Sequence, residues 1–128
     1  MRARAIFLLA IGLLLCACVY DRAPEAMTRD LSPAEKTMLA HSLTGTLKDP
    51  DSAKFDWVPV KYVPGAFKID YCGRLNAKNA DGVYSGFKIF HAILNHDDKG
   101  QFSTGRIDAE DAQEQCAKTG YTDFSQAK

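Results

Sequence analysis

The stretch AFKIDYCGRLNAKNADGVYSGFKIFHAIL, residues 66–94, decides the expected fold of this chain. Residues 66–77 and 83–94 are rich in apolar and β-forming side chains, and each is long enough for one strand. The intervening residues 78–82, KNADG, combine Asn, Asp and Gly, which favour turns. Because short links join antiparallel strands, the stretch predicts two antiparallel strands.

The side chains of these two strands alternate between the faces of the predicted sheet. In the first strand, one face receives Phe67, Ile69 and Tyr71. In the second strand, one face receives Phe87, Ile89 and Ile93, and the other receives Phe90. Gly73 interrupts the first pattern and predicts a β-bulge that changes the register.

An amphipathic helix is expected ahead of the strands. Ser32 is a good N-cap, Pro33 suits the first helical position, and Glu35 completes a capping box. The apolar residues that follow the helical period are Leu31, Ala34, Met38, Leu39, Leu43 and Leu47. The residue before Pro50 avoids the helical conformation, so a helix of about 15 residues ends near it.

Three further elements complete the prediction. Residues 55–63, FDWVPVKYV, favour a strand that Pro59 bends or confines to an edge. A short strand is expected near residues 101–107. Residues 108–118, DAEDAQEQCAK, predict a second helix with Asp108 as N-cap. Its thin apolar stripe consists of Ala109, Ala112, Cys116 and Tyr121.

Together these elements predict one α+β domain over residues 31–128. The N-terminal helix packs on one face of an antiparallel sheet of three to four strands, and a C-terminal helix follows. Because that last helix has few apolar side chains, it needs a further attachment to the body of the domain.

The first residues predict export. Arg2 and Arg4 precede an apolar segment of 11 residues, 5–15, whereas crossing a bilayer takes about 20 residues. The segment is typical of a secretory signal peptide. It runs into Leu15-Cys16-Ala17-Cys18, which resembles the lipobox of bacterial lipoproteins, Leu-x-(Ala/Gly/Ser)-Cys.

This resemblance implies that residues 1–17 are a lipoprotein signal peptide and that Cys18 carries fatty acyl chains at the mature N-terminus. Residues 18–30 then form a lipidated tether. Val19 stands where some lipoproteins carry the Asp that retains them in the inner membrane, which implies an outer-membrane protein with its domain in the periplasm. An ordinary signal peptide that leaves Cys18 as a plain thiol is the alternative.

Cys72 and Cys116 are then the two remaining cysteines, and the periplasm is oxidising. A disulfide between them would attach the last helix to the first strand of the opening stretch. By restricting the unfolded chain it would stabilise the fold by up to about 4 kcal/mol. A zinc site and a reactive thiol pair are the alternatives, although two distant cysteines without a CxxC motif are a poor zinc signature.

The charge balance argues against nucleic acid as a partner. The chain has 16 basic and 16 acidic side chains, and residues 1–18 hold two of the basic ones, Arg2 and Arg4, so 14 basic side chains remain against 16 acidic ones. The net charge of the rest is about −2, whereas a nucleic-acid binder needs a clustered basic face.

No catalytic motif is present, so we expect no enzyme activity, catalytic residue, metal or cofactor. Ser85 lacks the G-x-S-x-G pattern of a nucleophile elbow, and no glycine-rich phosphate loop occurs. The candidate metal ligands, poorly spaced, are His91, His96, Asp97 and Asp98. The carboxylates that fit a solvated helix face are Glu110, Asp111 and Glu114.

The segment YCGRLNAKNADGVYSGF, residues 71–87, holds the candidate binding site. Its Asn, basic and aromatic side chains suit a surface that grips a protein or glycan partner, because Tyr and Arg are favoured interface anchors. The expected contact residues are Asn76, Lys78, Asn79, Tyr84 and Phe87. Asn side chains that bind backbone groups and stabilise the loop are the structural alternative.

Three segments resemble a group of small exported proteobacterial proteins. They are KDPDSAKF at residues 48–55, CGRLNAKN at residues 72–79 and GVYSGF at residues 82–87. The group shares K-D-P-x-S-A-x-F and C-G-x-x-N-A-K-N-x-x-G-x-Y-x-G-F, and many members have a double Gly where this chain has Asp81-Gly82-Val83. The resemblance implies a shared fold unit and no particular reaction.

These observations predict a non-enzymatic outer-membrane lipoprotein, anchored through Cys18, whose domain binds an envelope protein, in an envelope or secretion assembly. The alternative function is an inhibitor of a cell-wall-active enzyme such as lysozyme, with Tyr84-Ser85-Gly86 inserted into the enzyme cleft.

Overall fold

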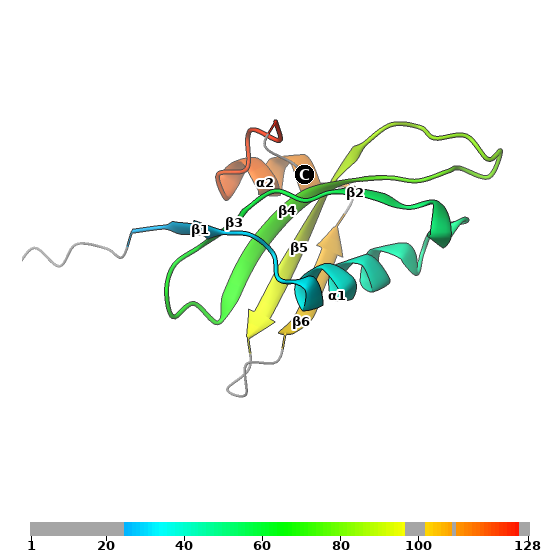
Figure 1. Ribbon diagram of the computed structural model, residues 1–128. Coiled ribbons are helices and arrows are strands. Elements are labelled where there is room, and N and C mark those ends of the chain that lie inside the picture. Colours follow the sequence, from blue (N-terminus) through cyan, green and yellow to red (C-terminus); the bar gives the residue numbers. More distant parts are fainter. Residues whose placement is uncertain (1–24, 97–101, 109, 126–128) are drawn as a thin grey trace, which may run out of the picture.

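The computed structural model describes residues 25–96, 102–108 and 110–125 (Figure 1). Cys18 and the whole expected signal peptide lie outside the described residues. In chain order the elements are β1 (Met27–Arg29), α1 (Pro33–Thr44), the 3₁₀ helix η1 (Pro50–Ser52), β2 (Lys54–Asp56), β3 (Val60–Tyr62), β4 (Lys68–Asn76), β5 (Lys88–His96), β6 (Phe102–Asp108) and α2 (Ala112–Lys118).

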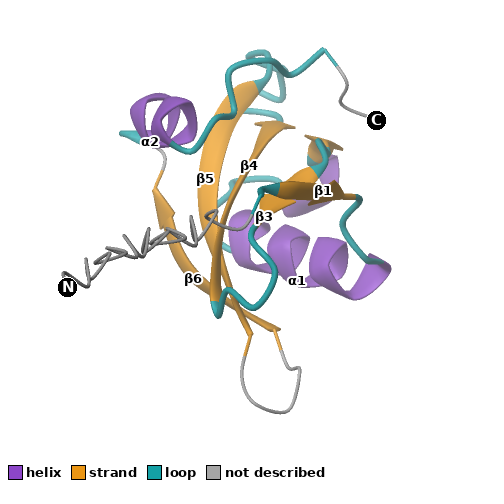
Figure 2. Ribbon diagram, turned by 90° about the vertical axis from the view of Figure 1, so that its left-hand side faces the viewer, coloured by secondary structure: helices purple, strands orange, loops and turns teal. Residues whose placement is uncertain are grey.

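The strands form two antiparallel sheets. The larger has the order β2-β4-β5-β6, and the smaller pairs β1 with β3. In Figure 2, α1 and the β1–β3 sheet lie on one face of the larger sheet and α2 lies on the other. The expected α+β class, the antiparallel pairing and the C-terminal helix held by a disulfide are therefore confirmed.

Alternation along β4 divides its side chains between the two layers. Tyr71 lies on the α1 face, where its hydroxyl contacts both backbone groups of Val58 at 3.1 Å. Cys72 points the other way and bonds to Cys116 of α2, with 5.9 Å between their Cα atoms. The buried core consists of Leu31, Leu39, Leu43, Val58, Val60, Ile69, Tyr71, Cys72, Phe90, Ala92, Leu94, Cys116 and Tyr121.

The start of α1 follows the expected capping box, but its buried face differs from the expected stripe. The Ser32 hydroxyl accepts from the Glu35 amide at 3.2 Å, and the Glu35 carboxylate accepts from the Ser32 amide at 2.8 Å. Ala34, expected in the stripe, is exposed, whereas Glu35 is fully buried. A buried carboxylate is tolerated here because Arg29 of β1 pairs with both of its oxygens, at 2.7 and 2.8 Å.

Residues 27–29, which lie inside the stretch predicted as a tether, form β1 and pair with β3. The strand predicted over residues 55–63 is in fact two strands in two different sheets, β2 and β3. Pro59 lies between them and lacks the N–H that a continuous ladder would need. The prediction of one strand was wrong, and the interruption falls at Pro59, where a bend or an edge position was expected.

Three details of the opening stretch were also wrong. β5 begins at Lys88, so residues 83–87 belong to the preceding loop. Gly73 is not a bulge, because it pairs with Phe90 in an unbroken β4–β5 register. A Cβ at Gly73 would lie 2.7 Å from Cζ of Phe90, so the glycine leaves room for this ring. Phe67, expected in the strand on the same face as Ile69 and Tyr71, precedes β4 and is exposed, whereas the other two are buried.

The second helix starts later than predicted. Asp108, the expected N-cap, is the last residue of β6 and pairs with His91 of β5. The N-cap is Asp111, and α2 begins at Ala112. The local composition is compatible with a helix that starts at Asp108, but pairing with β5 keeps residues 102–108 in a strand.

Candidate functional site

A long loop between β4 and β5, residues 77–87, projects beyond the larger sheet and is called the arm below (Figure 1). It leaves the body at the right of the view, at the opposite side from β1. Its two sides approach each other at an isolated antiparallel bridge between Lys78 and Tyr84. The arm is therefore a small hairpin-like unit, not an open loop.

Asn79 shapes the tip of the arm. Its side-chain oxygen accepts hydrogen bonds from the amides of Asp81 and Val83, at 2.9 and 3.1 Å. Its own amide donates to the Val83 carbonyl at 2.9 Å, and its carbonyl accepts from Gly82 at 3.0 Å. Gly82 has a φ of 75°, which a residue with a side chain rarely adopts. The side chain of Asn79 thus binds backbone groups and stabilises the loop, which was the alternative to a role in partner contact.

Ser52 of η1 fastens the arm to the body. Its hydroxyl accepts from the Lys78 amide at 2.9 Å and donates to the Asp49 carbonyl at 2.7 Å. Its carbonyl accepts from the Tyr84 hydroxyl at 3.0 Å. Sequence reasoning did not select Ser52 as a site residue, although it lies in the KDPDSAKF segment of the resemblance. The three resembling segments are therefore contiguous in space, and Ser52 links them.

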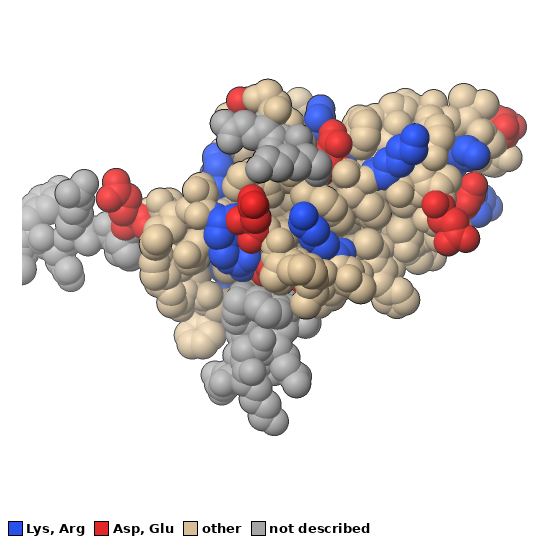
Figure 3. Space-filling model, viewed as in Figure 1, with Lys and Arg blue, Asp and Glu red and all other residues tan. Residues whose placement is uncertain are grey.

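Two lysines flank the Tyr84 ring. The Lys54 ammonium lies 4.5 Å from the ring centroid and the Lys78 ammonium 5.7 Å from it, both within cation–π range. The arm itself holds one basic and one acidic side chain, Lys78 and Asp81, and Figure 3 shows blue and red atoms together at the right-hand end of the molecule. The arm therefore presents mixed charge beside an aromatic ring, which suits a polypeptide better than a polyanion.

The base of the arm is organised by Arg74 of β4. Its guanidinium pairs with Asp56 at 2.6 Å and lies 5.5 Å from the ring centroid of Phe87 and 5.8 Å from that of Phe124. Asn76, the last residue of β4, has a buried side-chain oxygen with no hydrogen-bond partner within the described part of the chain. The Phe87 ring thus lies beside Arg74, which Asp56 holds in place, although the ring is still exposed.

The structure gives the five expected contact residues different positions. Asn76 is at the end of β4, and Lys78, Asn79 and Tyr84 hold the arm together. Phe87 is 44% exposed, and Val83, which also lies in the arm but was not selected from the sequence, is 59% exposed. The side chains of the arm that are free to contact a partner through apolar surface are therefore Val83 and Phe87.

The residues considered for catalysis do not converge. Ser85 is exposed in the arm, and His91 contacts Asp70 at 2.7 Å on the sheet. Asp97 and Asp98 lie outside the described residues. Among the residues that are described, no group of three His, Cys, Asp or Glu side chains is placed to hold a metal ion, and no helix is long and apolar enough to cross a membrane.

A second polar cluster surrounds Tyr121, beside a surface pocket of about 180 Å³. The Tyr121 hydroxyl accepts from the Lys61 amide at 2.8 Å and donates to the Asp70 carbonyl at 3.3 Å. Burial raises the pKa of Tyr121 to about 12, so its hydroxyl keeps its proton at neutral pH. The Lys61 ammonium donates to the Gly120 carbonyl. These contacts fasten the C-terminal segment to β3 and β4.

Comparisons of this chain with protein-family models, with curated proteins and with solved structures found no match. No relative supplies a function, so the side chains described above carry the proposal.

Proposed function

We propose that this protein is a non-enzymatic lipoprotein of the outer membrane whose periplasmic domain binds another envelope protein, in an envelope or secretion assembly. The arm is the proposed contact surface. Cys18 is the proposed lipid attachment site, and its acyl chains anchor the protein in the membrane.

The projecting arm is the observation that carries partner binding. It exposes Val83 and Phe87 on a loop whose shape is already held by hydrogen bonds of Asn79 and Ser52. A preorganised loop loses less conformational entropy on binding than an unstructured one. Arg74, which lies against Phe87, is of a residue type that frequently dominates binding energy at interfaces, and Phe is enriched there.

The N-terminal sequence and the disulfide support the proposed export and lipid anchoring. The lipobox-like Leu15-Cys16-Ala17-Cys18 sequence motivates lipidation. The Cys72–Cys116 disulfide suits an oxidising compartment such as the periplasm. Mass spectrometry of protein extracted from membranes is expected to find acyl chains on Cys18 and no residues 1–17. An unmodified, full-length chain in the cytosol would contradict this part of the proposal.

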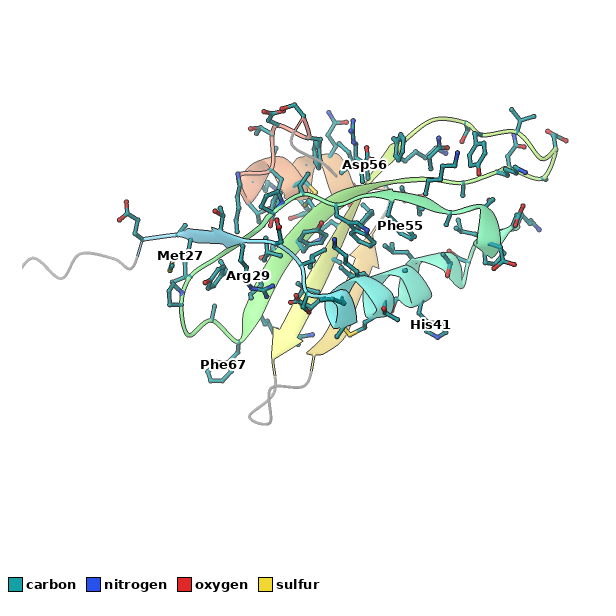
Figure 4. All side chains as sticks on the ribbon, in the orientation of Figure 1. Met27, Arg29, His41, Phe55, Asp56 and Phe67 are labelled. Carbon is teal, nitrogen blue, oxygen red and sulfur yellow. A yellow bond between two sulfur atoms is a disulfide. The ribbon has the colours of Figure 1, made fainter. Side chains whose placement is uncertain are left out.

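A photo-crosslinking experiment in intact cells tests the arm. A photoreactive phenylalanine analogue at position 83 is expected to capture one envelope protein. The same analogue at position 41, an exposed site on α1 (Figure 4), serves as the matched control and is expected to capture none. Equal capture from both positions would show that the arm is not the contact surface.

Substitutions separate contact from arm shape. Phe87→Ser is expected to abolish capture from position 83, because it removes exposed aromatic surface, whereas His41→Ser leaves capture unchanged. Asn76→Ala combined with Tyr84→Ala is expected to weaken capture, because Tyr84 fastens the arm to η1. Undiminished capture with Phe87→Ser would remove the proposed site.

Inhibition of a cell-wall-active enzyme such as lysozyme is the second candidate. The projection of the arm favours it, since a narrow loop can enter a cleft (Figure 1). Ser85 and Gly86 are exposed on the segment of the arm between the Lys78–Tyr84 bridge and β5. The purified protein would then slow the clearing of a bacterial suspension by lysozyme. Clearing at the uninhibited rate would eliminate this candidate for lysozyme.

A further inference from the structure

The exposed large apolar side chains of the described residues fall into two groups at different parts of the molecule. Val83 and Phe87 belong to the arm. The other three are Met27, Val63 and Phe67, with exposed fractions of 50%, 36% and 68%. We call these three the tether-end patch, because β1 begins just after the segment that leads back to Cys18.

The tether-end patch is built by the β1–β3 sheet and the turn after it. Met27 pairs with Tyr62 of β3, and Val63 follows directly. The Ala66 amide donates to the Val63 carbonyl at 3.0 Å, which closes a tight turn ahead of Phe67. Figure 4 shows Met27 and Phe67 at the same end of the molecule, with the Phe67 ring pointing away from the body.

Beneath these side chains the surface is hollowed. A pocket of about 280 Å³ is lined by Arg29 and Tyr62 as well as Val63, Phe67 and Ile69, whereas Met27 lies outside its lining. Grouped exposed apolar side chains of this kind mark a surface that contacts a protein or a membrane.

The length of chain between Cys18 and β1 indicates what contacts the tether-end patch. Eight residues lie between Cys18 and Met27, so the nine Cα-to-Cα steps of a fully extended tether span at most about 30 Å. That is about the diameter of a domain of this size, so the tether alone lets the domain turn either end toward the membrane. An apolar patch at the tethered end selects one orientation.

We propose that the tether-end patch rests on the lipid surface and holds the arm away from it. This inference relies on the proposed attachment at Cys18. Exposed Lys68 directly follows Phe67 and exposed Glu25 precedes Met27, and Arg29, which lines the pocket, is already paired with Glu35. The charges nearly balance, so apolar insertion, made effective by the high local concentration of a tethered domain, supplies the contact.

The test uses a chain that starts at Cys18, the mature form under the proposed function, which retains every described residue. With Cys72 and Cys116 bridged, Cys18 is its one free thiol. It is coupled to maleimide lipid in phosphatidylethanolamine–phosphatidylglycerol vesicles with brominated or unbrominated acyl chains. Tethering is thus chemical, and a failure of natural lipidation does not affect the result.

Phe67→Trp places a fluorophore in the patch, and Val83→Trp places the matched control in the arm. The parent chain, with its single tryptophan at position 57, gives the background. Brominated lipid is expected to quench the added emission of Phe67→Trp and to leave that of Val83→Trp unchanged. No quenching at position 67, or equal quenching at both positions, would overturn the inference and leave the patch to a protein partner.

Adding Met27→Ser and Val63→Ser to the Phe67→Trp chain completes the test. Because both side chains are exposed, these changes are expected to leave the fold intact, as circular dichroism would check. They are expected to reduce the quenching at position 67. Undiminished quenching would show that contact with lipid does not depend on the tether-end patch.

Discussion

Replacement of Arg29 by Met is expected to reverse the pH dependence of stability near Glu35. The Glu35 side chain is fully buried, and Arg29 donates to its two carboxylate oxygens at 2.7 and 2.8 Å. Burial alone raises the pKa of Glu35, but hydrogen bonds from Arg29 and Ser32 outweigh it, and the pKa lies below its ordinary value of 4.5. Met keeps most of the side-chain volume and removes the charge.

The expected loss at pH 7 is about 3 kcal/mol of unfolding free energy. Removing one partner of a buried ion pair typically costs about 3–5 kcal/mol, because the other charge stays buried without compensation. The lower end applies because the Arg29 side chain is 32% exposed, so water can reach the space it leaves. The Ser32 amide still donates to the carboxylate.

The sign of the pH effect distinguishes this mechanism from a loss of packing. In the parent chain the folded pKa of Glu35 is lowered, so its stabilisation is present above pH 4.5 and is lost as the pH falls through the folded value. In Arg29→Met, burial acts against the charge, so the folded pKa rises. Protonation then relieves the penalty, and the variant recovers toward the parent as the pH falls.

Urea unfolding followed by tryptophan fluorescence measures both effects. Trp57 stacks on Phe55 at 4.7 Å between ring centroids and reports loss of the core. Arg74→Met is the matched control, because the Arg74–Asp56 pair is partly exposed on both sides and such pairs are worth about 1 kcal/mol or less. An Arg29→Met loss below about 1 kcal/mol, or one that is constant between pH 7 and pH 4, would refute the reasoning.

Three further predictions concern the disulfide, the glycine of β4 and the arm. Cys72→Ala with Cys116→Ala is expected to lower the unfolding free energy by up to about 4 kcal/mol, and reduction of the parent should have the same effect in urea titrations. Gly73→Ala is expected to cost about 1–3 kcal/mol, and less in a Phe90→Leu background, which a double-mutant cycle would measure. Tyr84→Phe removes the hydroxyl bond to η1, so amide exchange in the arm should accelerate while global stability falls by about 1 kcal/mol.

Much of the fold could be predicted because local signals and long-range packing agree. The capping box at Ser32 and Glu35 is a local signal, and it is present in α1. The disulfide was predicted because few cysteines remained to be assigned. The errors in the start of β5 and the start of α2 share one cause, because pairing between strands that are distant in sequence sets both boundaries. The β4–β5 pairing begins at Lys88 and leaves residues 83–87 in the loop, and pairing with His91 keeps Asp108 in β6.

The candidate site was predicted only as a segment. Its Asn, Lys and aromatic residues could be identified from composition, but their division into structural and exposed side chains could not. Asn79 and Tyr84 form hydrogen bonds within the fold, whereas Val83, an ordinary apolar residue, is the most exposed large apolar side chain of the arm. Ser52 had no local signal of its role, because its partners lie 26 and 32 residues away.

The sequence by itself determined the elements that depend on neighbours along the chain: the start of α1, the apolar strands, the turn chemistry of residues 78–82 and the apolar N-terminal segment. Only the tertiary structure decided which groups meet across the fold, namely Arg29 with Glu35, Gly73 with the Phe90 ring, and Ser52 with the arm. The physical reason is that propensity and periodicity act within a few residues. The burial of a charge or the exposure of an apolar side chain depends on every element that packs around it.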